Sequence, residues 1–102
     1  MTSRVPDDVH EVSPFDLIPT HGMTMSRRGF ERLKAAIRGA GRVEVPVCYV
    51  VFRDGRYIVD GHHRVRAARQ LGLPSVPSRE VELPFRGYQD ISDLFDGLTW
   101  ID

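Results

Sequence analysis

The sequence has little cysteine and no long apolar run, and each absence excludes a class of protein. The single cysteine, Cys48, cannot form an internal disulfide or a cysteine-rich zinc site. It lies inside the apolar run 47–51, so we expect it to fill the core rather than to react. No stretch of about 18 apolar residues occurs, so we expect neither a membrane span nor a membrane partner.

The first ten residues, MTSRVPDDVH, lack the continuous apolar core of a secretory signal peptide. We therefore expect a cytoplasmic site of action, and delivery by a secretion system that needs no signal peptide stays open. A length of 102 residues suits one small domain. We expect residues 1–8 to be a flexible lead-in and 9–102 to form a single domain, with 84–102 as a C-terminal extension packed on it.

The charges balance over the whole chain, with 14 basic and 14 acidic side chains, but they are segregated along it. Residues 27–69 carry a net charge of +7, and the remainder carries −7. A basic middle suits an anionic ligand such as a nucleotide or a nucleic acid. The alternative is that the basic segment pairs with the acidic tail inside one fold.

Apolar periodicity and turn residues predict an α+β fold with a small mixed sheet. One helix is expected over 27–39, capped by Ser26 and ended by Gly39 and Gly41. Its apolar stripe comprises Phe30, Leu33, Ala36, Ile37 and Ala40.

Strands are expected over 45–52 and 56–59, joined by the turn dipeptide Asp54-Gly55. A second helix follows over 61–71, with Arg66, Arg69 and Gln70 facing out. Other predicted elements are short: strands at 10–12 and within 76–83, and a helix at 90–95.

The segment Asp60-Gly61-His62-His63-Arg64 stands where the second strand of this hairpin leads into the second helix. This placement predicts a phosphate-binding turn. Gly61 lets a ligand approach the backbone closely, and the first turn of a helix offers unpaired N–H groups and partial positive charge. Arg64 adds a guanidinium that matches phosphate oxygens.

The other members of this segment each have two interpretations. Asp60 either caps the helix or holds Mg²⁺ at the phosphates. His62 and His63 either donate to phosphate and move a proton, or make structural hydrogen bonds. Adjacent histidines rarely ligate one ion, so a zinc site is not expected. No P-loop and no dinucleotide fingerprint occurs.

Residues 57–72, YIVDGHHRVRAARQLG, resemble the signature of the ParB/sulfiredoxin superfamily. Three upstream segments agree with this. Asp16–Pro19 and Arg32–Gly41 resemble the first box and the helix of that superfamily, and Val45–Val47 resembles its next strand. The resemblance extends over about residues 10–83.

The resemblance implies a small nucleotide-binding fold in which the strand–Gly-x-x-Arg–helix turn holds phosphates. Members include partition proteins that bind and hydrolyse CTP, sulfiredoxins, ADP-dependent serine kinases, nuclease-like domains and toxin domains of bacterial polymorphic toxins. Asp60 would occupy the metal or catalytic position of the kinase-like members. The predicted phosphate-binding residues are Gly61, His62, His63, Arg64 and Arg66, and the predicted catalytic residues are Asp60, His62, His63 and His21.

At several motif positions this sequence differs from members of the superfamily, and these differences reduce the range of expected functions. Sulfiredoxins have their reactive cysteine where this chain has His62, so sulfinic acid reduction is not expected. Partition proteins have Gly-Glu-Arg-Arg in place of Gly-His-His-Arg, and their DNA-binding and dimerisation domains find no room in 102 residues. The serine kinases use a glutamate near the position that His21 occupies in this chain. His21 could replace that glutamate as the base, and the alternative is that kinase activity is absent.

Three functions stay open on the sequence alone. The first is an enzyme that hydrolyses or transfers a nucleotide phosphate with Mg²⁺, with the toxin effector role that the resemblance implies as one form of it. The second is a nuclease that holds DNA or RNA on the basic helix, and the third is a non-catalytic nucleotide- or DNA-binding module. The apolar side chains of the tail (Tyr88, Leu94, Phe95, Trp100) are expected in the core, with a partner patch as the alternative. Its acids (Asp90, Asp93, Asp96) suit a solvated face or, alternatively, a basic partner or immunity protein.

Overall fold

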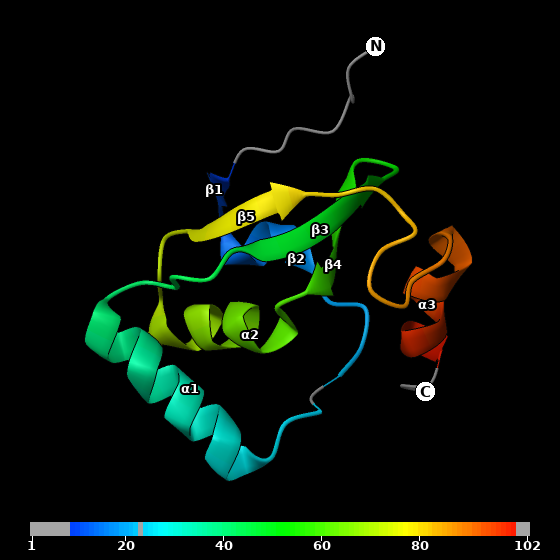
Figure 1. The fold of residues 1–102 in the computed structure, drawn as a ribbon. Helices are drawn as coiled ribbons and strands as arrows, with labels where there is room; N and C mark the ends of the chain where they lie inside the picture. Colours follow the sequence, from blue (N-terminus) through cyan, green and yellow to red (C-terminus); the bar gives the residue numbers. More distant parts are fainter. Residues whose placement is uncertain (1–8, 23, 100–102) are drawn as a thin grey trace.

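A five-stranded mixed sheet forms the centre of the computed structural model, which describes residues 9–22 and 24–99 (Figure 1). The predicted lead-in 1–8 and Trp100 lie outside the described residues. The strand order is β1-β5-β3-β4-β2. The elements in chain order are β1 (His10–Val12), the 3₁₀ helix η1 (Pro14–Asp16), β2 (Leu17–Ile18), α1 (Arg27–Ala40), β3 (Val47–Phe52), β4 (Gly55–Asp60), α2 (His62–Leu71), β5 (Val76–Glu80) and α3 (Ile91–Thr99).

The sheet is mixed because its central strand, β3, pairs antiparallel with β4 and parallel with β5. The outer strands follow, with β2 parallel to β4 and β1 antiparallel to β5. This arrangement confirms the predicted α+β class. Among the described residues, no helix is long and apolar enough to cross a bilayer.

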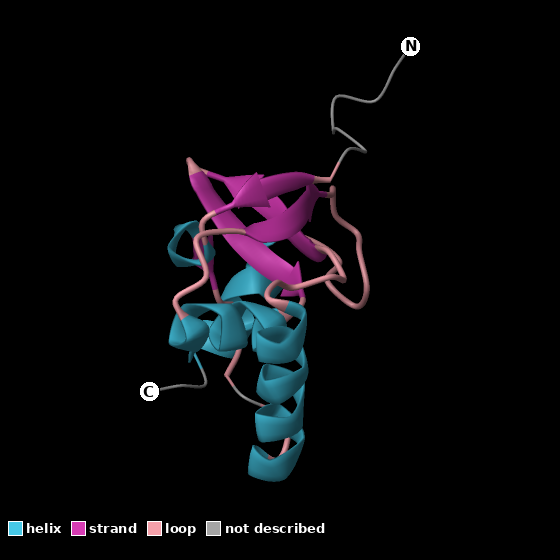
Figure 2. Cartoon of the chain, turned by 90° about the vertical axis from the view of Figure 1, so that its left-hand side faces the viewer, coloured by secondary structure: helices cyan, strands magenta, loops and turns pink. Residues whose placement is uncertain are grey.

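The two faces of the sheet bury different residues of β3, as the period of two in a strand requires. Val47 and Tyr49 belong to the core beneath α1 and α2, which lie together on one side of the sheet (Figure 2). Cys48 and Val50 pack on the opposite side with Leu94 of α3. Cys48 is therefore core filler as expected, and burial raises the pKa of its thiol.

Helix α1 has the predicted caps, Ser26 and Gly41, but fewer of its residues form the buried apolar stripe than the sequence predicts. The Ser26 hydroxyl accepts from the Gly29 N–H at 3.0 Å, and the left-handed Gly41 (φ 79°) closes the helix. Phe30 and Ile37 are buried, with Leu33 half-buried against them. The predicted stripe residues Ala36 and Ala40 are exposed, and Gly39 lies inside the helix.

The β3–β4 turn lies one residue earlier than the predicted Asp54-Gly55. Arg53 and Asp54 are the two left-handed residues (φ 49° and 68°), and Gly55 already pairs with Phe52 in the ladder. Gly55 serves close packing instead, because a Cβ there would lie 2.9 Å from the Tyr57 ring. β3 begins at Val47 rather than at residue 45.

The expectation that Arg69 faces solvent is wrong, because its guanidinium makes hydrogen bonds within the fold. Its Nε donates to the Pro14 carbonyl at 2.9 Å, and its Nη2 donates to the Leu17 carbonyl. The guanidinium also lies over the ring of Phe15. The side chain therefore ties α2 to η1 and to the edge strand β2.

Replacing Arg69 with leucine removes the donors of two carbonyls, so we expect Arg69→Leu to lower the free energy of unfolding by about 2 kcal/mol. The matched control is Arg66→Leu on the exposed side of the same helix, for which we expect a change within about 0.5 kcal/mol. Denaturant unfolding of both variants measures the difference. Equal effects would contradict this role of Arg69.

Candidate functional site

The junction between β4 and α2 is built on Gly61, which has a left-handed backbone (φ 105°) and occupies the N-cap of α2. No described side chain caps this helix, so Asp60 is not the cap that the sequence allowed. A Cβ on Gly61 would lie 3.0 Å from both Val47 Cγ2 and Arg64 Nη2. Only glycine fits here, and it leaves the first N–H groups of α2 open to a ligand.

A cleft of about 500 Å³ opens at this junction. It brings together six of the predicted site residues and adds four apolar ones that the sequence analysis did not place there. Arg66 is the exception, since it is exposed on α2 and does not line the cleft. The predicted residues that line it are His21, Asp60, Gly61, His62, His63 and Arg64, and the apolar ones are Met25, Leu33, Val45 and Val59.

One carboxylate oxygen in the cleft faces two guanidinium groups. Oδ2 of Asp60 lies 3.5 Å from Nη2 of Arg64 and 3.9 Å from Nε of Arg86. Arg86 does not itself line the cleft and reaches its edge through Asp60. It comes from the segment between β5 and α3, far along the chain, and nothing in the sequence motif indicated it. Two positive groups around one negative group leave the end of β4 with surplus positive charge.

His62 uses its Nε2 to hold the loop that precedes α1. The Thr20 N–H donates to this nitrogen at 3.1 Å, and the Thr20 hydroxyl lies 2.9 Å from it. An imidazole nitrogen that accepts from a backbone N–H carries no proton, so His62 is neutral with its proton on Nδ1. Burial, together with the nearby His21 and His63, lowers the pKa of His62 to about 3.

His63 holds the other end of the same loop. Its Nε2 accepts from the Thr24 N–H at 3.2 Å and from the Met25 N–H at 3.3 Å. Burial lowers the pKa of His63 as well, with His21 and Arg66 adding to the effect. His62 and His63 thus point to opposite ends of one loop, which fixes that loop as a wall of the cleft.

The ring of His21 stacks on that of His62, with centroids 3.6 Å apart. Its Nδ1 lies 2.7 Å from the Gly22 carbonyl, to which it donates. Within the described ranges, Nε2 of His21 has no hydrogen-bond partner, whereas Nε2 of His62 and Nε2 of His63 accept from the loop, so His21 keeps this nitrogen available in the cleft.

Thr20 and Tyr88 are site residues that the sequence analysis did not identify. Thr20 is 1% exposed, and its hydroxyl donates to the Ile58 carbonyl at 2.8 Å. The Tyr88 hydroxyl lies 2.9 Å from the same oxygen. A continuous polar chain therefore joins the C-terminal segment to His62 through Thr20.

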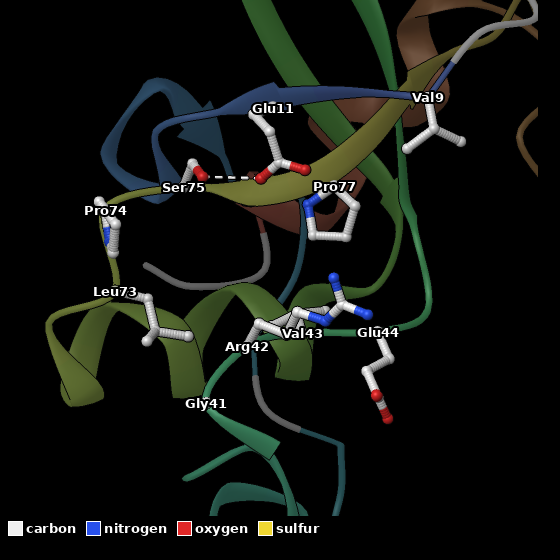
Figure 3. A pocket seen from close by; sticks show the side chains of 10 residues that line it. All are labelled: Val9, Glu11, Gly41, Arg42, Val43, Glu44, Leu73, Pro74, Ser75 and Pro77. Atoms are coloured by element: carbon white, nitrogen blue, oxygen red, sulfur yellow. Dashed lines mark hydrogen bonds between the residues drawn. The ribbon is translucent and has the colours of Figure 1, made fainter.

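A second cleft of about 510 Å³ lies at the far ends of the helices, beside Gly41 after α1 and Leu73 after α2 (Figure 3). Its carboxylate Glu11 accepts from the Ser75 hydroxyl at 2.7 Å. Helix C-termini present carbonyl groups and partial negative charge, which repel anions. Between this cleft and the β4–α2 cleft, electrostatics favours the β4–α2 cleft for an anionic ligand.

Asp60 suits a Mg²⁺ ion that arrives with phosphates rather than an ion held by protein alone. In the part of the chain that the structure describes, no group of three or more His, Cys, Asp or Glu side chains could hold a metal. Magnesium is commonly bound through one or two carboxylates plus substrate phosphates. A single half-buried carboxylate beside the helix N-terminus fits that arrangement.

Together these features define an α+β domain with a cleft whose chemistry suits an anionic ligand. A profile of the ParB N-terminal domain matches residues 3–87, and the chain belongs to this family. The resemblance predicted from the motif is confirmed, and Asp60 to Arg64 lie inside the matched region.

Solved structures show the same fold. The C-terminally truncated chromosome-partitioning protein ParB from Caulobacter crescentus, complexed with CTP-gamma-S, is 26% identical, with a TM-score of 0.66 over 91% of this chain and 52% of that one. A free serine kinase in complex with AMP is 22% identical, with a TM-score of 0.64 over 80% of this chain and 35% of that one. Sulfiredoxin from Arabidopsis thaliana is 21% identical, with a TM-score of 0.62 over 72% of this chain and 84% of that one.

The chain spans about a third of the length of the first three structures that it matches. A search of the curated proteins finds no match.

The histidine contacts predict a pH-dependent stability. Unfolded His62 has a pKa near 6.5 and folded His62 one of about 3, so the unfolded state binds more protons between these values. Stability therefore falls as the pH drops through this window, by about 2 kcal/mol between pH 7 and pH 5. Denaturant unfolding at both pH values measures this loss.

The matched variant is His62→Gln, whose amide oxygen can accept from Thr20 but does not titrate. We expect its pH dependence to be smaller than that of the wild type, with the remainder contributed by His63. An unchanged pH dependence in His62→Gln would show that the imidazole is not the titrating group.

Proposed function

We propose that the protein binds the phosphates of a nucleotide at the β4–α2 junction and, with Mg²⁺, hydrolyses or transfers one of them. The observation that carries this proposal is the uncapped start of α2, which opens with Arg64 into one cleft. Oriented backbone N–H groups and a guanidinium form a preorganised anion site. Family membership supports it, as do a ParB complexed with CTP-gamma-S and a serine kinase in complex with AMP.

The residues take distinct roles in this proposal. Gly61 and Arg64 bind phosphate, and Asp60 holds the Mg²⁺ that neutralises developing charge, since phosphoryl transfer is mostly positioning and charge stabilisation. His62 and His63 position the loop through their Nε2 atoms. His21, with Nε2 available, is the candidate to move a proton.

The test measures binding and phosphate release with ATP, ADP, CTP, GTP and UTP in Mg²⁺. We expect Arg64→Gln to weaken nucleotide binding by about tenfold or more, because a charge-assisted contact is lost. The matched control, Arg66→Gln, is two residues further along the same helix and outside the cleft, and should bind within about twofold of the wild type. Equal losses in the two variants, or no binding by the wild type, would contradict the proposal.

Asp60→Asn separates binding from chemistry. In EDTA, we expect this variant to bind nucleotide more tightly than the wild type, because it removes a negative charge from beside Arg64 and Arg86. In Mg²⁺, we expect it to lose turnover. Turnover equal to that of the wild type would exclude Asp60 as the metal-holding residue, and binding without turnover by the wild type would assign a non-catalytic module.

A second candidate function is nucleic-acid binding on α1, and the exposed arginines of this helix favour it. Each of them is exposed, and none of them takes part in an ion pair among the described residues, where the basic partners are Lys34, Arg64 and Arg86. The exposed arginines of α1 are Arg27, Arg28, Arg32 and Arg38, and the exposed Arg42 follows just after the helix.

The acidic tail does not neutralise this surface where the structure describes it. The carboxylates of Asp90 and Asp93 accept from Ser92 and from backbone N–H groups at the start of α3. The apolar side of α1 faces the core, where Phe30 and Ile37 are buried. Several exposed guanidinium groups on one helix suit a phosphate backbone.

We expect Arg28→Gln/Arg32→Gln to reduce the slope of log affinity against log salt for duplex DNA by about 2, one counterion for each arginine. The matched control Arg53→Gln/Arg79→Gln changes two exposed arginines away from α1 and should keep the slope. Fluorescence anisotropy over a salt series measures both, with single-stranded DNA and RNA as further probes. Cleavage of a probe in Mg²⁺ that is lost in Asp60→Ala would assign the nuclease function.

A further inference from the structure

The segment between β5 and α3 forms a tight turn whose geometry is well defined. Phe85 and Tyr88 exchange two backbone hydrogen bonds, of 2.8 and 2.9 Å, across the two residues between them. Arg86 (φ 46°) and Gly87 (φ 92°) both have left-handed backbones, as a two-residue hairpin turn requires. Arg86 is thus held at a fixed backbone position although its side chain is 66% exposed.

This turn is attached to the fold on two sides. Phe85 and Tyr88 pack on the second core cluster, which contains Val59 and Leu94. The Tyr88 hydroxyl lies 2.9 Å from the Thr20 hydroxyl, which is itself bonded to the carbonyl of Ile58 in β4. The turn is therefore anchored both to the sheet and to the loop that walls the cleft.

The guanidinium of Arg86 is directed to the end of β4. It lies over the Phe85 ring, 5.4 Å from the centroid, and its Nε is 3.9 Å from Oδ2 of Asp60. Arg64 approaches the same oxygen at 3.5 Å. Two guanidinium groups from different elements therefore flank one position beside the N-terminus of α2.

We propose that Arg86 is the second arginine of the anion site and extends it from one phosphate to two. The inference rests on the proposed phosphate binding at the β4–α2 junction. Arg64 and the N–H groups of α2 bind the first phosphate. Arg86 then breaks its contact with Asp60 and binds the adjacent phosphate group of a nucleoside di- or triphosphate. The site then prefers nucleoside diphosphates and triphosphates to monophosphates, because a monophosphate reaches only Arg64.

The experiment compares inorganic phosphate with pyrophosphate, and AMP with ADP, by isothermal titration calorimetry in EDTA. We expect Arg86→Gln to weaken pyrophosphate and ADP binding by about tenfold and to change phosphate and AMP binding by less than about twofold. Arg79→Gln, an exposed arginine on β5, is the matched control and should change neither. Tyr88→Phe, which frees the turn from Thr20 but keeps the ring, should weaken pyrophosphate binding to an intermediate degree.

Two results overturn the inference in distinguishable ways. If Arg86→Gln binds both kinds of ligand as the wild type does, or weakens both equally, Arg86 does not contact a second phosphate. If the wild type binds neither phosphate nor pyrophosphate nor nucleotide, the proposed phosphate site fails and this inference fails with it.

Discussion

The left-handed backbone of Gly61 fixes where β4 ends and α2 begins. With φ at 105° and no room for a Cβ between Val47 and Arg64, the chain turns sharply from strand to helix at this one residue. Because no described side chain caps α2, the N–H groups of its first turn remain directed at the cleft. The anion site, the position of Arg64 and the start of the helix all depend on this turn.

The two histidines after Gly61 join this turn to the rest of the cleft. They accept backbone N–H groups from Thr20, Thr24 and Met25, so the loop before α1 is held against the start of α2. This use of Nε2 requires neutral imidazoles, which agrees with a pKa of His62 lowered by burial. The two histidines therefore give the cleft a wall of defined shape. The consequence is that the free energy of unfolding falls in acid, where the imidazoles become protonated. His21 keeps one ring nitrogen available.

Much of the fold could be predicted from the sequence because its signals are local. The cap residues Ser26 and Gly41 and the placement of Gly61 between strand and helix required no tertiary information. The misses have tertiary causes: Arg69 lies outside the apolar stripe of α2, but its long side chain reaches two loop carbonyls. Thr20 meets His62 and Tyr88 across 42 and 68 residues of sequence, and Arg86 meets Asp60 from another turn, so no local pattern could indicate these contacts.

The backbone N–H signals of His62, His63 and Arg64 in a ¹H–¹⁵N NMR titration with ADP test the central claim most directly. If the start of α2 binds phosphate, these amides should show the largest shifts, since an N–H that gains an anionic acceptor changes its chemical environment most. The amides from Gly41 to Glu44, in the second cleft (Figure 3), should stay close to their free positions. Shifts concentrated at Gly41–Glu44, or absent from residues 62–64, would contradict the account.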